Sequence, residues 1–260
     1  MSLDSLSQLY SQRLHPVFMS LFNVVPFNEL TSWPTASDLN ELAPGPLTFI
    51  DDPDVTTQTG QLLEELGYEG FIHQTRSVPT RRNWHDAFNA SIWHQFPKVK
   101  QRLNQLHIAY IKQHGALPRG RIRDHITHFD ECGIIIAYTA NNPIPELLHQ
   151  HQWHSAFVEN KTQWGNQIDA FVFGHANLEM LLSPHIGLTG KWVGIEVPEG
   201  FFTQRPNMQT ALLDALLALR LDEEFFATKL PPLPFLGIPG WWTTQDAEFY
   251  ANTDYFRPKR

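Results

Sequence analysis

The sequence predicts a single α+β domain that is rich in helix, with a small mixed sheet and an extended C-terminal segment. Three observations lead to this class. Apolar residues recur at helical spacing over several long segments, whereas residues 132–139 form a short β-branched run typical of a buried strand. From residue 231 onward the chain is rich in Pro, Gly and Trp, which favours an extended tail packed on the body.

The expected elements follow from apolar periodicity and from the glycines and prolines that end it. The expected helices are 58–66, 84–96, 98–114, 145–158, 174–182 and 208–228. The expected strands are 46–51, 132–139, 168–173 and 186–197. Residues 1–45 are punctuated by proline and are expected to be irregular. Because the sequence contains no internal repeat and no linker, residues 1–260 are interpreted as one domain.

The cysteine count and the apolar stretches of the sequence indicate where in the cell the protein is expected. The single cysteine, Cys132, excludes an internal disulfide framework and a zinc ribbon with several cysteines. The N-terminus lacks the basic region of a signal peptide, and no stretch approaches the roughly 20 apolar residues that span a bilayer. We therefore expect a soluble cytoplasmic protein without a membrane partner, and the oligomeric state is left open.

Charge is segregated along the chain. Residues 73–123 hold ten of the 19 Lys and Arg residues but only one of the 27 Asp and Glu residues, Asp86. A basic block inside an acidic protein indicates what kind of molecule the protein binds, but it does not indicate the fold. It favours either a pocket for a small anionic molecule or a surface that docks on nucleic acid or on an acidic protein.

Polar residues lie on the apolar face of the first helix in this block. At 100° per residue, His85 and Asn89 fall within or beside the sector formed by Phe88, Ile92 and Phe96. An unpaired buried polar group costs roughly 1–3 kcal/mol, so both side chains need a partner. A hydrogen-bonded core histidine and a functional site both satisfy that requirement.

The next helix carries Lys100, Asn104 and His107 along the edge of its apolar stripe. The two helices could therefore present converging polar edges, although a solvated face explains the second group equally well. Farther along, His175 and Glu179 lie one helical turn apart. Such a pair could bind a divalent metal ion from adjacent turns, or the carboxylate could simply orient the imidazole.

The densest polar stretch, residues 119–131, precedes the β-branched run and is interpreted as a loop leading into that strand. Arg121 and Arg123 offer planar forks for phosphate or carboxylate. Asp124, Asp130 and Glu131 could bind a metal ion or act as acid and base. A cluster of salt bridges in a loop is the alternative interpretation.

Several catalytic classes are disfavoured by missing motifs. The sequence has no Gly-x-Gly-x-x-Gly fingerprint, no P-loop, no Gly-x-Ser-x-Gly elbow and no His-Glu-x-x-His pair. Cys132 has no electropositive neighbour in the sequence that would activate a thiol nucleophile. Nicotinamide, P-loop and serine-hydrolase chemistries are therefore not expected.

A set of motifs lies between residues 82 and 258, within a resemblance that covers about residues 45 to 258. They are Arg82-Asn-Trp-His-Asp-Ala-Phe-Asn-Ala90, Phe96-Pro-Lys-Val-Lys100, Leu103-Asn-Gln-Leu-His107, Arg123-Asp-x-x-Thr-x-Phe-Asp-Glu-x-Gly133, Phe173-Gly-His-Ala-x-x-Glu179, Leu236-Gly-Ile-Pro-Gly-Trp-Trp242 and Phe256-Arg-Pro258. Together they resemble the bacterial family catalogued as domain of unknown function 3025. The resemblance implies a bacterial cytosolic protein but no activity, and it suggests that several of the polar groups above share one site.

The favoured function is an enzyme, a metal-assisted hydrolase or transferase that acts on a phosphorylated or other anionic substrate. The cofactor would be a divalent metal ion. The expected catalytic residues are His85, Asp124, Asp130 and Glu131, the expected substrate-binding residues are Asn89, Lys100, Asn104, Arg121 and Arg123, and the expected metal ligands are His107, His175 and Glu179. The first alternative is a binding protein whose block 73–123 docks on nucleic acid or an acidic partner. A structural protein that associates through helix 208–228 is the second.

Overall fold

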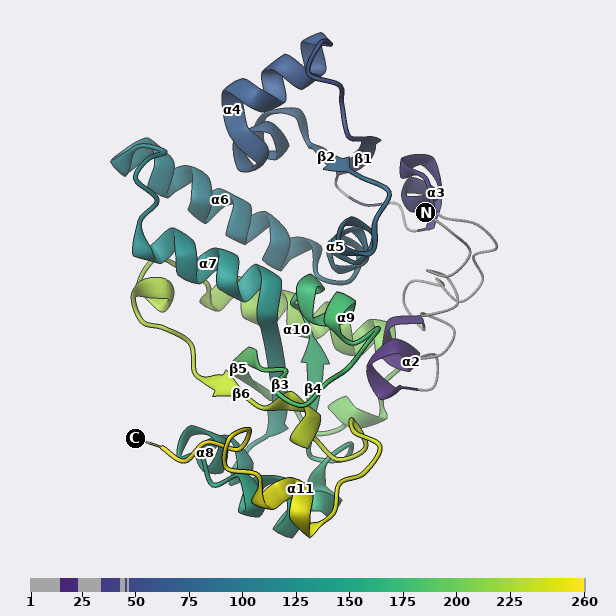
Figure 1. Ribbon diagram of the computed structural model, residues 1–260, viewed down its shortest axis with the longest axis vertical. Helices are drawn as coiled ribbons and strands as arrows, with labels where there is room; N and C mark the ends of the chain where they lie inside the picture. The colour runs from purple at the N-terminus through teal and green to yellow at the C-terminus, as the bar shows by residue number, and fades with distance from the viewer. Residues whose placement is uncertain (1–14, 23–33, 43–44, 46, 260) are drawn as a thin grey trace.

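A central four-stranded sheet organises the protein, whose computed structural model describes residues 15–22, 34–42, 45 and 47–259 (Figure 1). The strands follow the order β4-β3-β5-β6. Their bounds are β3 Gly133–Thr139, β4 Ile168–Val172, β5 Gly190–Val197 and β6 Pro232–Leu233. Strand β3 runs antiparallel to β4 and parallel to β5, and β6 runs antiparallel to β5. This mixed sheet, together with abundant helix, confirms the α+β class.

Helices cover the sheet and build a separate lobe above it (Figure 1). Their bounds are α2 Pro16–Phe22, α3 Ala36–Leu42, α4 Gln58–Thr75, α5 Trp84–Gln95, α6 Pro97–His114, α7 Arg121–Cys132, α8 Ile144–His149, α9 His175–Met180, α10 Pro206–Arg220 and α11 Ala247–Ala251. Helices α7 and α10 pack against β5, and α9 contacts β4. Above them, β1 (Thr48–Asp51) pairs in parallel with β2 (Ser77–Thr80), and α4 makes the crossover between these two strands.

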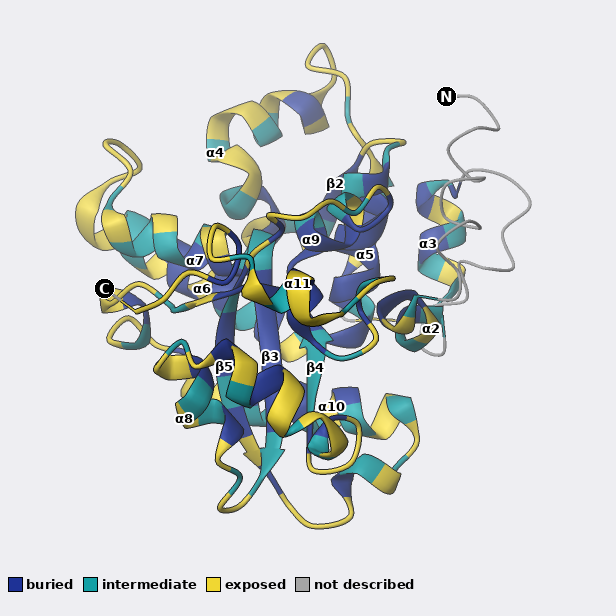
Figure 2. Ribbon diagram, turned by 60° about the horizontal axis from the view of Figure 1, so that its bottom comes forward, coloured by how far each residue is buried: buried dark blue, intermediate teal, exposed yellow. Residues whose placement is uncertain are grey.

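The core is centred on β3, where every residue from Gly133 to Ala137 is buried. Both faces of this strand are covered, which explains its continuous apolar run where alternation would otherwise be expected. Figure 2 shows that buried residues gather on the central strands and on α5, whereas much of α4 is exposed. The elements that carry the polar side chains discussed below are thus anchored on a rigid, close-packed base.

The main correction to the sequence-based expectations concerns residues 119–131. They are not a loop, because residues 121–132 form helix α7. Ile126 and Phe129 are fully buried, and Ile122 packs partly against the core, so apolar residues recur every three or four positions. The charged residues occupy the remaining faces of this amphipathic helix. A dense polar composition had hidden the helical period.

Several other expected elements also differ. Helix α4 does not stop at Gly67 but bends there, at φ 66°, and continues to Thr75. Segment 145–158 contains only a short helix, α8, followed by a π-turn at Ser155–Glu159. Helix α10 ends at Arg220 and not at residue 228. Within residues 1–45 the described parts include helices α2 and α3, and the rest lies outside the described residues.

The C-terminal segment from residue 231 crosses the body as expected, with Trp241 and Phe256 buried, although it contains the short helix α11. In the part of the chain that the structure describes, no helix combines the length and the apolar character needed to cross a bilayer.

Candidate metal centre

Helices α5, α7 and α9 meet at the edge of the sheet where β3 begins and β4 ends. Helix α7 ends directly before β3, and α9 begins directly after β4, so the antiparallel pairing of these strands brings both helix termini to one edge. The close approach depends on Gly174, because a Cβ at this position would lie 2.4 Å from the Glu131 carbonyl oxygen. As a result the first residue of α9, His175, lies beside the last turn of α7.

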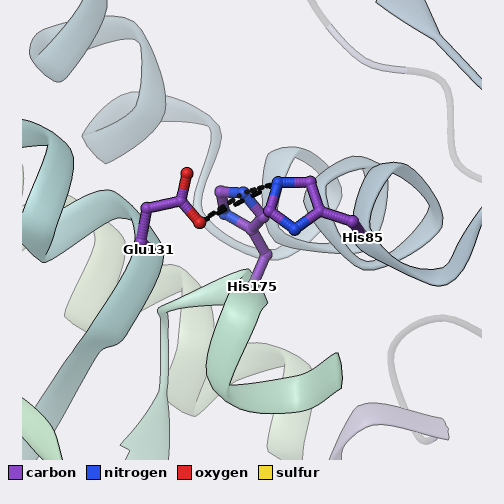
Figure 3. A group of neighbouring side chains, drawn as sticks. All are labelled: His85, Glu131 and His175. Atoms are coloured by element: carbon purple, nitrogen blue, oxygen red, sulfur yellow. Dashed lines mark hydrogen bonds and ion pairs between the residues drawn. The ribbon is translucent and has the colours of Figure 1, made fainter. Parts of the chain in front are cut away.

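His85, Glu131 and His175 converge at this point from α5, α7 and α9 (Figure 3). The two Nε2 atoms of the histidines are 3.1 Å apart. The Oε2 atom of Glu131 lies 3.3 Å from Nε2 of His175 and 3.8 Å from Nε2 of His85. These three side chains form a group that could hold a metal ion.

The hydrogen bonds of the other ring nitrogens indicate which tautomer each histidine adopts when its ring is neutral. Nδ1 of His175 lies 3.0 Å from the backbone carbonyl oxygen of Asp130, which can only accept, so this nitrogen donates. Nδ1 of His85 lies 3.1 Å from Oε2 of Glu179 and donates to that carboxylate. In the neutral rings each Nε2 therefore carries a lone pair. Two ring lone pairs and one carboxylate oxygen then face one another at separations of 3.1 to 3.8 Å.

Burial strengthens this arrangement. His175 is only 3 % exposed, and its burial lowers the pKa of the imidazole to about 3, so the ring is neutral at pH 7. Burial raises the pKa of the Glu131 carboxyl, while the neighbouring His85 opposes that change. The three acceptors consequently need either a cation or a shared proton between them.

A second polar group lies directly behind the first and is saturated with hydrogen bonds. The buried Nζ atom of Lys100 donates to both carboxylate oxygens of Asp130, at 2.6 and 2.8 Å, and to Oδ1 of Asn89 at 2.9 Å. Asn89 in turn donates to the hydroxyl of Tyr68. Burial is the largest single influence and would raise the pKa of Asp130, but the charge and hydrogen bonds of Lys100 together with the His175 and His107 imidazoles lower it overall. This group uses all three protons of the lysine.

The three-residue group opens onto a cleft of about 810 Å³ between α4, α6 and α7. Three arginines and seven acids line this cleft: Arg81, Arg119 and Arg123, against Asp52, Glu64, Glu65, Glu69, Asp86, Asp130 and Glu131. The lining is therefore acidic overall, and the basic block 73–123 does not make the cleft positively charged. The cations of the block 73–123 are dispersed, since Lys100 is buried and Arg102 donates to the Leu221 carbonyl beyond the cleft.

The predicted site residues fall into three places. His85, Glu131, His175 and Glu179 meet at the convergence point, and Asn89, Lys100 and Asp130 form the saturated group behind it. Asn104 and His107 lie deeper in the cleft wall beside Glu69, with Nε2 of His107 4.0 Å from Oε1 of that residue and outside the three-residue group. Arg123 lines the cleft, whereas the exposed Arg121 and Asp124 do not. Asp124 pairs instead with Arg119 at 3.0 Å.

Sequence reasoning missed Tyr68 and Glu69, which line the cleft from α4. Both follow the bend at Gly67, which turns the second half of the helix toward α6. A glycine followed by further apolar residues at helical spacing is the signal that could have indicated a bend rather than a helix end.

The family match agrees with the resemblance of the motifs. Residues 49–260 match the model of the family described as protein of unknown function (DUF3025). The chain belongs to this family. Neither the curated proteins nor the solved structures gave a match to the chain. All three residues of the convergence point lie inside the matched region.

Proposed function

We propose that this DUF3025 protein is a metal-dependent hydrolase in which His85, His175 and Glu131 bind one divalent transition-metal ion. The observation that carries the proposal is that the Nε2 atoms of two histidines and a carboxylate oxygen of Glu131 meet, while the Nδ1 atom of each histidine already donates its proton elsewhere. A metal ion and a shared proton are the two occupants that would relieve the repulsion. Ligand spacing and the surroundings favour the metal.

The spacing fits a tetrahedral site. Zinc–nitrogen and zinc–oxygen bonds of about 2.0–2.2 Å place neighbouring tetrahedral ligands roughly 3.3–3.5 Å apart. The three observed separations are 3.1, 3.3 and 3.8 Å. Two imidazoles and one carboxylate suit zinc and its transition-metal neighbours better than calcium or magnesium, which prefer oxygen ligands only.

The surroundings also resemble those of metal ligands. Imidazole ligands usually donate their second ring proton to a carbonyl or a carboxylate, which fixes the tautomer and the ring orientation. Here the Asp130 carbonyl does this for His175 and the Glu179 carboxylate does it for His85. With three protein ligands and a cleft in front, a fourth coordination position would face the substrate, as in catalytic zinc sites.

The chain supplies the remaining groups for hydrolysis. A bound dication would polarise a substrate oxygen and lower the pKa of a coordinated water. Oε1 of Glu131 has no hydrogen-bond partner among the described residues, so it is placed to accept a proton from a nucleophilic water. The acidic lining does not favour nucleic acid as the substrate, because a polyanion would be repelled by the surplus of carboxylates.

Elemental analysis of the purified protein tests the proposal. We expect about one zinc, or a comparable hydrolytic metal, per chain, and turnover in a panel of phosphatase, phosphodiesterase and peptidase substrates that chelation abolishes and zinc restores. His175→Ala should lose the metal, whereas His128→Ala, which removes an exposed histidine on α7, should keep it. Metal-free protein that takes up no added zinc would show that a proton occupies the site. Tightly bound iron with oxygen consumption would replace hydrolysis by redox chemistry.

A further inference from the structure

One arginine in the cleft has no acidic partner. Arg123 lies on α7, eight residues before Glu131, and lines the same cleft. Its Nη1 atom donates to the Ala116 carbonyl at 2.8 Å, and its Nε atom is buried without a hydrogen-bond partner. Among the described residues it forms no ion pair. A guanidinium has five N–H donors, so most of the hydrogen-bonding capacity of this side chain is unused.

The other two arginines of the lining are already engaged. Arg81 makes a two-pronged contact with Asp86, through Nε to Oδ2 at 2.9 Å and through Nη2 to Oδ1 at 3.0 Å. Arg119 pairs with Asp124 at 3.0 Å. The surplus of carboxylates in the lining is therefore a property of the whole cleft, whereas Arg123 is a local site of unpaired positive charge.

A second unpartnered group lies close to Arg123. His107 is 3 % exposed, and its Nδ1 atom has no hydrogen-bond partner. Burial lowers the pKa of this imidazole, and the nearby Arg123 guanidinium lowers it further against the opposing charge of Glu69. Two buried nitrogens without partners in one cleft wall are unusual, because buried polar atoms are normally satisfied. A carboxylate in the cleft would supply acceptors for the terminal N–H groups of Arg123.

We propose that Arg123 binds a carboxylate group of the substrate. The planar guanidinium matches a carboxylate with two parallel hydrogen bonds. A compact monoanion fits better than a phosphate dianion, because repulsion by the surrounding acids increases with the charge of the ligand. The assignment of this carboxylate to a substrate rests on the proposed hydrolase function, but its binding does not.

Helix geometry gives the length of that substrate. Eight residues of α-helix separate Arg123 from Glu131, a rise of about 12 Å at 1.5 Å per residue. The substrate would therefore carry its hydrolysable bond on the order of 10 Å from its carboxylate. The cleft of about 810 Å³ has room for a molecule of this length. An extended peptide of about three residues has suitable dimensions.

Binding of hippurate (N-benzoylglycine) and its uncharged amide to chelator-treated protein tests the proposal. Removing metal beforehand prevents the carboxylate from binding at the three-residue group, so the result is independent of the hydrolase proposal. By NMR titration we expect hippurate to bind and hippuramide to bind at least tenfold more weakly. Arg123→Met should raise the dissociation constant of hippurate about tenfold or more, and the matched variant Arg121→Met, outside the cleft, should change it less than twofold.

The variants must remain folded, which thermal unfolding verifies. If Arg123→Met fails to fold, Arg123→Lys decides, since it keeps the charge but loses the planar fork and should weaken hippurate at least threefold. Equal binding of hippurate and hippuramide, or wild-type affinity in the folded Arg123 variants, overturns the proposal. Tighter binding of phenyl phosphate than of hippurate overturns the choice of carboxylate.

Discussion

Asp130 and Glu131 are adjacent in the sequence but lie in opposite electrostatic situations. Both carboxylate oxygens of Asp130 accept hydrogen bonds from Lys100, in a group where donors and acceptors are matched. Glu131 faces the Nε2 atoms of two imidazoles, and when both rings are neutral this group has three acceptors and no donor. A saturated polar group adds rigidity and specificity, whereas an excess of acceptors favours the binding of a cation or of a shared proton. The two neighbours therefore have different tasks.

The saturated group supports the unsaturated one. The carboxylate of Asp130 is held by Lys100, and its backbone carbonyl accepts the Nδ1 proton of His175. Anchoring this residue thus fixes the orientation of one proposed metal ligand. The comparison predicts that removing charge from the two groups has effects of opposite sign on the stability of the metal-free protein.

The largest effect is expected at the saturated group. Lys100→Met leaves the Asp130 carboxylate buried without its cation, which should reduce the free energy of unfolding by about 3–5 kcal/mol. The double variant Lys100→Met with Asp130→Asn should recover much of that loss, because no buried charge remains. Urea unfolding measures both, with the exposed Lys98→Met on the same helix as a control. A loss below about 1 kcal/mol would mean that water solvates Asp130.

Removing the negative charge from the group of His85, Glu131 and His175 should not lower the free energy of unfolding. In metal-free protein, Glu131→Gln replaces a carboxylate by an amide that can donate to an imidazole lone pair, so the free energy of unfolding should stay equal or rise. With zinc at 100 times its dissociation constant, the wild type should gain about 2.7 kcal/mol, and the variant should gain much less. Chemical unfolding with and without zinc checks both parts, with Glu248→Gln on α11 as the exposed control. Equal zinc stabilisation of both proteins would remove Glu131 from the site.

Glu179 tests whether the hydrogen bond behind His85 matters for binding. Loss of a carboxylate that orients an imidazole ligand typically weakens metal affinity by about 10- to 100-fold. We expect this reduction for Glu179→Ala and a smaller one for Glu179→Gln, whose amide oxygen can still accept the Nδ1 proton. Competition with a zinc chelator measures the affinities, and Glu196→Gln on β5 is the exposed control. Unchanged affinity in Glu179→Ala would show that the contact is incidental.

Local periodicity predicted much of this site. The angle of His85 and Asn89 on their helix correctly placed them beside the apolar sector, and the β-branched run correctly placed β3. Both inferences depend only on residues a few positions apart, which is the range over which sequence determines the face of an element.

The convergence of His85, Glu131 and His175 could not be predicted from residues only a few positions apart. His85 and His175 are 90 residues apart, and they meet because β3 pairs with β4 and because Gly174 permits a close approach. Periodicity gives the face of a residue but not the distance to another element, so it could not show that His85, and not His107, lies beside His175 and Glu131. The opposite error occurred in α7, where abundant charge obscured two buried apolar residues, Ile126 and Phe129.

A third carboxylate extends the comparison, because Asp169 on β4 pairs with no lysine or imidazole among the residues that the structure describes. It lines a separate cavity of about 240 Å³, accepts a hydrogen bond from the Ala170 amide, and has its pKa raised by burial to about 6. Since this is above the ordinary value of 3.8, the folded state holds the proton more tightly than the unfolded state. Stability is therefore lost as the pH rises from about 4 to about 6, and the full cost remains at higher pH.

Asp169→Asn should remove that cost, because an amide is neutral at every pH and can still accept the Ala170 hydrogen bond. Each pKa unit corresponds to about 1.4 kcal/mol, and partial exposure reduces the benefit to about 1–2 kcal/mol at pH 7.5. At pH 4 the variant and the wild type should be nearly equal. Urea unfolding at the two pH values measures the difference, with the exposed Asp254→Asn as a control. An advantage that persists at pH 4 would assign the effect to packing, and a loss at pH 7.5 would mean that the Asp169 carboxylate has a cationic partner in solution.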